Sequence, residues 1–351
     1  MTESTLFDPV SLGRSQLPNR INMAPMTRAR TDQPGDIPSE MMARYYSQRA
    51  TAGLIISEAT QISPQGKGYS FTPGIHSEGH IAGWHRVTEA VHEAGGRIFC
   101  QLWHVGRMSH ASFHKDGKTV APSAIAPQAQ VWISDGTGAG TMVDCPVPRA
   151  LAETEISAII DDYRRAAIHA LKAGFDGVEI HGANGYLIDQ FLRSSANQRT
   201  DQYGGSPENR TRFMREVLEA LIDVWGADRV GIRLSPNGDS QGTDDSNPPA
   251  TFGAAAKVCE ELGLAFVELR EPGPDGTFGQ TDVPKQSPLI RQIYTGALIL
   301  NSDYTAEQAE ADVTSGKCDA VSFGRPYISN PDLEKRIAVG AHWNPNKDVP
   351  K

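Results

Sequence analysis

Short apolar runs alternate with amphipathic segments along most of the chain. Several runs are apolar on consecutive residues, as expected for parallel strands that are covered on both faces. We count about eight of them, at residues 22–27, 54–59, 98–103, 177–181, 230–235, 266–270, 297–300 and 320–323. Because eight strands that alternate with helices are what a closed β/α barrel requires, the pattern predicts an α/β fold of the (β/α)8 TIM-barrel type.

The segments between these runs have the spacing of helices. In residues 155–174 the apolar side chains recur at the i, i+3, i+4, i+7 positions of one buried face, namely Ile156, Ile159, Ile160 and Tyr163. Gly174 follows at the position of a left-handed helix C-cap. The same order of helix, glycine and strand recurs at residues 81–95, 207–226 and 250–263.

Two segments exceed a minimal barrel. The residues before Pro18 carry turn signals at Asp8-Pro9 and Gly13, which predict a hairpin that plugs the amino-terminal mouth of the barrel. An insertion at 104–152, between the third strand and its helix, is rich in Gly, Pro, Ser and Ala. We predict that it caps the site with a strand or two of its own around Val131-Trp132-Ile133. We see no second core, so residues 1–351 are expected to form a single barrel domain.

Composition and charge narrow the class of protein. Hydrophobic residues make up 39% and charged residues 21% of the chain, and no apolar run approaches the roughly 18 residues of a membrane span. The amino terminus lacks a basic segment followed by an apolar one, so we expect a cytoplasmic protein. A formal net charge of −9 argues against a nucleic-acid or anionic-membrane partner.

The cysteines and histidines give no metal pattern. The four cysteines are far apart and lack CxxC spacing, which disfavours zinc, iron–sulfur and disulfide sites; they are Cys100, Cys145, Cys259 and Cys318. The histidines fall into two groups, His76 with His80, and His104 with His110 and His114. Because no HExxH motif is present, we expect no metal site.

Three polar side chains gather at the carboxyl end of the predicted strand 177–181. They are His181, Asn184 and Tyr186, at the strand end where a barrel enzyme binds its substrates. His181 and Asn184 can both donate hydrogen bonds, and two donors aimed at one oxygen suit a reaction that builds enolate-like charge. Tyr186 could deliver a proton. A structural histidine and a tyrosine that anchors a turn by its hydroxyl are the alternatives.

Other strand ends indicate a bound heterocycle with a phosphate. The Phe323-Gly324-Arg325 turn follows the last strand, where barrels commonly bind phosphate; the alternative is an arginine paired with a surface carboxylate. A ring attached to that phosphate would lie toward Gln101, Arg233 and Thr27, an amide, a cation and a hydroxyl. These groups suit a planar ring whose edge alternates donors and acceptors, as in flavin mononucleotide.

At these residues the chain resembles the old yellow enzymes, the FMN-dependent ene-reductases, in the bacterial subgroup of pentaerythritol tetranitrate and N-ethylmaleimide reductases. The resemblance extends from residue 6 to about 345. The motifs are NRINMAPMTRAR at 19–30, CQLWHVGRMSH at 100–110, HGANGYLIDQFLRSSANQRTDQYGGSPENR at 181–210, GIRLSP at 231–236 and FGRPYISNPDL at 323–333.

The resemblance implies a role for each site residue. It implies that Thr27 bonds the flavin C4 carbonyl, that Gln101 and Arg233 hold the pyrimidine edge, and that Pro25, Met26 and Ala59 offer backbone contacts. Four residues would surround the phosphate: Ser302, Asp303, Gly324 and Arg325. His181 and Asn184 would bind the substrate oxygen and Tyr186 would donate the proton. Tyr69 and Trp103 would line the pocket.

The implied chemistry is ping-pong reduction of activated alkenes. NADPH or NADH reduces the flavin and leaves, and an α,β-unsaturated carbonyl compound, imide or nitroalkene then takes the hydride while Tyr186 protonates it. The partners would be small molecules, and the protein a monomer or homodimer. A flavin dienoyl-CoA reductase would need an iron–sulfur cysteine cluster, and a flavin-free barrel aldolase or isomerase a Schiff-base lysine or a metal. A non-catalytic flavin-binding protein is the third alternative.

Three features depart from the family pattern. Position 184 is Asn where many relatives have His, which keeps a donor but removes a titratable group. The turn Asn301-Ser302-Asp303 stands where relatives often have glycines. Asp303 must therefore point away from the phosphate, or the role implied for this turn does not apply to this chain. Relatives continue past the position of Lys351 into a Gly/Tyr-rich tail, so we expect one pocket wall to be open or the chain to be trimmed.

Overall fold

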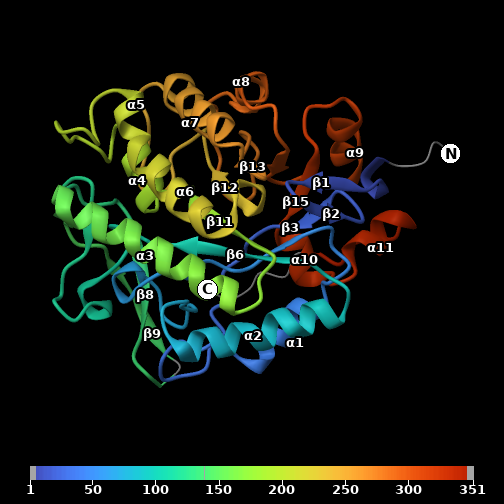
Figure 1. The fold of residues 1–351 in the computed structure, drawn as a ribbon, viewed down its shortest axis with the longest axis horizontal. Helices are drawn as coiled ribbons and strands as arrows, with labels where there is room; N and C mark the ends of the chain where they lie inside the picture. The colour runs from blue at the N-terminus through green and yellow to red at the C-terminus, as the bar shows by residue number, and fades with distance from the viewer. Residues whose placement is uncertain (1–4, 138, 346–351) are drawn as a thin grey trace.

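A closed barrel of parallel strands lies at the centre of the computed structural model, which describes residues 5–137 and 139–345 (Figure 1). In barrel order the strands are β3 (Ile21–Met23), β4 (Ile55–Ile56), β6 (Ile98–Trp103), β11 (Gly177–Gly182), β12 (Val230–Leu234), β13 (Phe266–Arg270), β14 (Leu298–Asn301) and β15 (Ala320–Phe323). Each pairs in parallel with the next, and β15 pairs with β3. The predicted (β/α)8 TIM barrel is confirmed.

The first two strands are shorter than predicted. β3 ends before Pro25, which has no N–H to continue the ladder. β4 is interrupted, and its continuation β5 (Thr60–Gln61) pairs with β6 again. Glu58 lies in the gap, fully buried, and its carboxylate accepts the N–H groups of Arg28 and Ala29. The strand pairing between β4 and β6 is therefore interrupted at Glu58, the buried residue that binds the segment after β3.

Helices surround the barrel (Figure 1). The predicted segments correspond to α2 (Glu78–Glu93), α3 (Glu153–Lys172), the pair α5 (Pro207–Arg210) and α6 (Arg212–Trp225), and α7 (Pro248–Leu262). The others are α1 (Glu40–Ser47), α4 (Leu187–Leu192), α8 (Ser287–Ile293), α9 (Ala306–Thr314), α10 (Arg325–Ser329) and α11 (Leu333–Ala338). Gly263 ends α7 in the left-handed conformation, with φ +63°. No helix in the described ranges is long and apolar enough to span a bilayer.

An antiparallel hairpin closes the amino-terminal mouth of the barrel, as predicted. It consists of β1 (Val10–Leu12) and β2 (Ser15–Leu17). Leu12 and Leu17 are buried in one cluster with residues from the strands and the segments that enter them: Leu54, Ile56, Phe99, Ala265, Phe266, Ile299 and Ala320. Strand polarity places Phe99 and Phe266 at the amino ends of β6 and β13. The hairpin therefore completes the hydrophobic cluster at the amino-terminal mouth of the barrel.

Truncation of the hairpin should destabilise the fold. We expect Leu12→Ala to lower the free energy of unfolding by about 2–5 kcal/mol, because it removes a fully buried side chain and leaves a cavity. The matched control is Gln16→Ala on the exposed face of the same hairpin, with an expected change within about 0.5 kcal/mol. Denaturant unfolding measures both. Equal effects of the two substitutions would show that the hairpin does not support the core.

The insertion after β6 forms its own small strands, as predicted. β7 (Val120–Ala121) pairs in parallel with β10 (Arg149–Ala150), and β8 (Gln130–Ser134) forms an antiparallel hairpin with β9 (Gly140–Asp144). Val131 of β8 is buried in a cluster with Ala59 and Trp103, and Tyr186 packs against this cluster. The insertion therefore covers the carboxyl ends of β6 and β11, where the candidate site lies.

Candidate active site

A cavity of about 700 Å³ opens at the carboxyl ends of the barrel strands, a volume typical of small-molecule sites. The predicted site residues that line it are Pro25, Met26, Thr27, Ala59, Gln101, Trp103, His181, Asn184, Tyr186, Arg233, Ser302, Asp303, Gly324 and Arg325. Tyr69 is absent from the lining and lies against Tyr186. Residues Trp343, Asn344 and Pro345 form part of the wall. Residues 346–351 lie outside the described ranges.

β11 itself carries His181, and a tight turn after the strand positions Asn184 and Tyr186. Asn184 and Gly185 both have left-handed backbone angles, with φ of +57° and +77°. The Asn184 N–H donates to the Ser235 hydroxyl at 2.8 Å, and the Gly185 N–H donates to Asp189 Oδ2 at 2.8 Å. Asp189 is fully buried and pairs with Arg193 at 2.9 Å. These buried hydrogen bonds and the ion pair hold the backbone of the turn in place.

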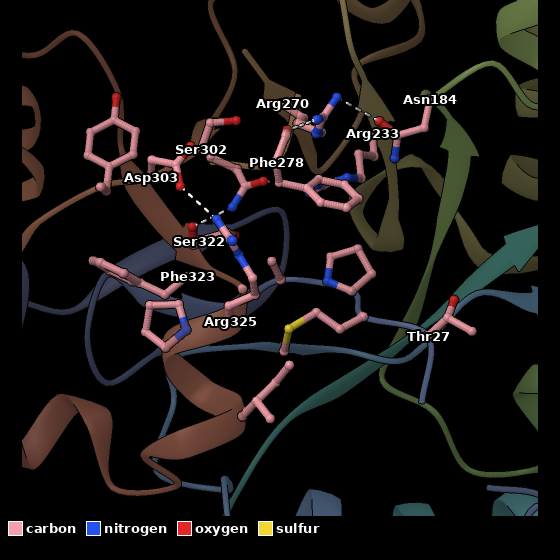
Figure 2. Close-up of a pocket in the computed structure, with 18 of the residues that line it drawn as sticks. Thr27, Asn184, Arg233, Arg270, Phe278, Ser302, Asp303, Ser322, Phe323 and Arg325 are labelled. Atoms are coloured by element: carbon pink, nitrogen blue, oxygen red, sulfur yellow. Dashed lines mark hydrogen bonds and ion pairs between the residues drawn. The ribbon is translucent and has the colours of Figure 1, made fainter. Parts of the chain in front are cut away.

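His181 and Asn184 are two uncharged hydrogen-bond donors. Burial, and second the nearby Arg233 cation, lower the pKa of His181 to about 3. The imidazole is therefore neutral at physiological pH. The Asn184 Oδ1 accepts a hydrogen bond from the Arg270 guanidinium at 3.2 Å, so its Nδ2 is the end that is free to donate (Figure 2).

Tyr186 lies against aromatic neighbours. Its hydroxyl is 3.1 Å from the hydroxyl of Tyr69, and its ring meets Trp103 and His181 edge-on, with centroid distances of 5.0 and 4.8 Å. Tyr69 in turn stacks on Trp103 at 5.6 Å. Burial raises the pKa of Tyr186, so the phenol keeps its proton. The hydroxyl contacts another phenol rather than the turn, which argues against a purely anchoring role.

Two buried glutamates bond the side chains of Gln101 and Arg233. Gln101 Nε2 donates to Glu179 at 2.7 Å, while Arg233 pairs with Glu268 and donates to Asn301 Oδ1 at 2.8 Å. Burial, and then the neighbouring Glu268 carboxylate, raise the pKa of Glu179 well above its usual range. Sequence reasoning missed both glutamates. The available signal was a single acidic residue inside each of two strands, between the apolar neighbours Val178 and Ile180 and between Val267 and Leu269.

The turn after β14 faces Arg325. Ser302 and Asp303 have φ values of 130° and 49°, where glycine would be favoured. Asp303 Oδ1 lies 2.8 Å from Arg325 (Figure 2). Both side chains also bond Thr277. Asp303 therefore points toward Arg325, the residue that the resemblance places at the phosphate. Its carboxylate neutralises the cation that a phosphate would contact, because the left-handed turn directs the side chain toward α10.

Two further residues of the site were not predicted. Glu58 fixes the backbone beside Thr27 by accepting N–H groups from the next two residues, at 3.1 and 3.0 Å. Burial raises the pKa of Glu58 to about 7. Arg270 at the end of β13 lines the cavity beside Asn184. Glu58 follows an apolar run and Arg270 ends one, so both lie at strand ends where functional groups gather.

The residues present fit a flavin with a phosphate tail. Thr27 and Arg325 lie apart in the cavity (Figure 2). Gln101 and Arg233 line the same cavity. The buried Ser322 hydroxyl lines the same cavity and has no hydrogen-bond partner in the described part of the chain. A Cβ added at Gly324 would make an ordinary van der Waals contact with Met26, at 3.6 Å. Across residues 5–137 and 139–345, no group of three potential metal ligands is placed to hold an ion.

A barrel whose cavity combines these groups defines a flavin-dependent oxidoreductase class. The sequence matches the NADH:flavin oxidoreductase / NADH oxidase family over residues 5–344. The chain belongs to this family and is an oxidoreductase.

Known relatives share nearly the whole chain. The old yellow enzyme homologue from Zymomonas mobilis is 50% identical, with a TM-score of 0.94 over 98% of this chain and 95% of that one. Morphinone reductase, solved in complex with tetrahydroNAD, is 46% identical, with a TM-score of 0.90 over 97% and 92%. A probable flavin mononucleotide-dependent alkene reductase of Leishmania infantum is 41% identical over 97% and 92%. The resemblance to the old yellow enzymes is confirmed.

Proposed function

We propose that this protein is an NAD(P)H-dependent FMN ene-reductase. It reduces the activated C=C bond of α,β-unsaturated carbonyl compounds, imides or nitroalkenes. The observation that carries the proposal is the convergence of a neutral His181, the amide of Asn184 and the protonated phenol of Tyr186 on one cavity. The relatives support it, because one is described as an alkene reductase and another binds a nicotinamide analogue.

The cavity offers a separate contact for each part of FMN. Arg325 and the backbone around Ser302 and Gly324 would hold the phosphate. Gln101, Arg233 and Thr27 would hold the ring edge and the C4 carbonyl, with the Arg233 cation stabilising negative charge there. When bound, FMN supplies the hydride carrier that links the nicotinamide to the alkene. A phosphate must compete with Asp303 for Arg325, so the ion pair seen here would open on binding.

The donor pair binds the oxygen of the activating group. His181 and Asn184 each present an N–H to the oxygen, and the charge that builds on this oxygen strengthens both bonds. Because His181 is neutral, it donates through its single ring N–H and does not carry the second, acidic proton of an imidazolium. The carboxamide oxygen of a nicotinamide can use the same two donors, so one pocket serves both half-reactions.

Tyr186 supplies the proton to the α-carbon of the alkene. Its phenol is protonated throughout the physiological range, so the donor is always in its competent form. The Tyr69 hydroxyl, at 3.1 Å, can donate to the Tyr186 oxygen as that oxygen becomes negative. Trp103 stacks on Tyr69 and holds this pair against the pocket wall. We further propose a cytoplasmic protein whose partners are small molecules.

The test is turnover with a simple enone. Purified protein should be yellow, release FMN on heat denaturation, and oxidise NADPH or NADH in the presence of 2-cyclohexenone. A colourless protein that takes up no FMN would overturn the proposal. A yellow protein that turns over no activated alkene would instead be a flavin-binding protein without this activity.

A further inference from the structure

Arg270 projects from the end of β13 into the same cavity as the donor pair (Figure 2). Its side chain donates to the Oδ1 of Asn184 at 3.2 Å and to the backbone carbonyl of Phe278. The Phe278 ring covers the guanidinium at 5.0 Å and is itself 65% exposed. Arg270 as a whole is only 7% exposed. The cation is thus enclosed between Asn184 and a loop.

Arg270 has no acidic partner within 4.0 Å among the residues that the structure describes. Other buried arginines of this barrel do: Arg193 pairs with Asp189 at 2.9 Å, Arg210 with Asp245 at 3.4 Å, and Arg233 with Glu268. A buried cation without a counter-ion is costly, and its cost falls when an anion binds beside it.

Two other buried arginines also lack a carboxylate partner. Their guanidinium N–H groups donate to protein oxygen atoms instead, so they need no bound ligand. Arg107 donates to two backbone carbonyls and a threonine hydroxyl, and Arg49 donates to three backbone carbonyls. Neither lines the cavity. Arg270 has two acceptors for its five N–H groups in the described part of the chain, and it faces the substrate space.

The remaining groups at this end of the cavity do not neutralise Arg270. His181 is neutral, and the carboxylates that act on Arg270 from further away, Asp303 and Asp189, pair with Arg325 and Arg193. The pKa of Arg270 is lowered to about 10 by burial and by the Arg233 cation, so the guanidinium stays charged.

We propose that Arg270 and Asn184 form one oxyanion-binding unit that makes the site favour alkenes whose activating side carries a carboxylate over their neutral esters. Arg270 holds the amide through Oδ1, so Nδ2 faces the substrate, and the guanidinium provides the fixed charge that the amide lacks. This inference rests on the proposed function, because it names the substrate class of that site.

The binding test uses a matched pair of unreactive ligands and the FMN-loaded enzyme. Calorimetric titration should show that 2-oxopentanoate binds at least about tenfold more tightly than its methyl ester, as expected for a hydrogen bond to a charged group. In Arg270→Gln the preference should fall to within about twofold, and in Arg270→Lys it should be partly retained. Arg28→Gln removes another cation that lines the cavity but has no bond to Asn184, and should keep the wild-type ratio.

The kinetic test compares (E)-2-oxopent-3-enoate, whose carboxylate is attached to the activating ketone, with its methyl ester. The ratio of the two kcat/KM values should favour the acid in the wild type and collapse in Arg270→Gln. A wild-type enzyme that prefers the ester in both measurements would overturn the inference even if no variant folds. An unchanged acid preference in Arg270→Gln would also overturn it. Reduction of neutral 2-cyclohexenone by the wild type tests the proposed function separately.

Discussion

Replacing Tyr186 with Phe is expected to slow the reduction of enones by about 10²–10⁴-fold, the usual contribution of a positioned proton donor. The substitution keeps the ring that meets Trp103 and His181 edge-on, and removes only the hydroxyl. Reduction of the bound flavin by NADPH transfers no proton from this phenol, so its rate should be largely unchanged. Stopped-flow measurement of each half-reaction separates the two effects.

Tyr69→Phe is the matched control. It removes the hydroxyl that lies 3.1 Å from Tyr186 Oη but leaves the proposed donor in place, so its effect on the enone step should be much smaller. Equal losses in both half-reactions of Tyr186→Phe would mean that Tyr186 has a structural role.

Removal of a substrate-oxygen donor should slow both half-reactions. We expect His181→Ala and Asn184→Ala each to cost about 10²–10³-fold in rate, or about 2.7–4 kcal/mol, the typical loss for one such donor. The alkene and the nicotinamide use the same two N–H groups, so neither step should be spared. Single-turnover rates at saturating NADPH and at saturating enone provide the measurement, with flavin content as the check on folding.

The dependence of the turnover rate on pH tests whether His181 and Asn184 are uncharged. His181 has a folded pKa of about 3, below the usual value of about 6.5, so it gains a proton only as the pH falls toward 3. Its donor role should therefore be constant from about pH 5 to 8, and Asn184 does not titrate. A rate in the wild type that changes tenfold around pH 6.5, and no longer does so in His181→Ala, would contradict a neutral His181.

Much of the barrel could be predicted because burial on both faces leaves a clear apolar pattern. β6, β13 and β15 have the predicted bounds. β4 does not, since its ladder is broken by Glu58, whose hydrogen bonds go to a segment about 30 residues away. A contact between residues so far apart in the chain does not change the pattern of apolar residues, so the break in β4 could not be predicted from that pattern.

The candidate site could be predicted where residues follow strands and less well where side chains contact one another. The positions of His181, Asn184 and Tyr186 follow from β11 alone. The direction of Asp303 does not, because it depends on a left-handed turn and on Arg325 from another strand end. Arg270 was missed for the same reason: its bond to Asn184 joins residues 86 positions apart.

The most direct test of the proposed ene-reductase is an anaerobic titration of the purified protein in two steps. Addition of NADPH or NADH should bleach the visible flavin absorbance, and subsequent addition of 2-cyclohexenone should restore it with formation of cyclohexanone. A flavin that is not bleached by either nicotinamide, or that stays bleached in the presence of the enone, would contradict the proposed function.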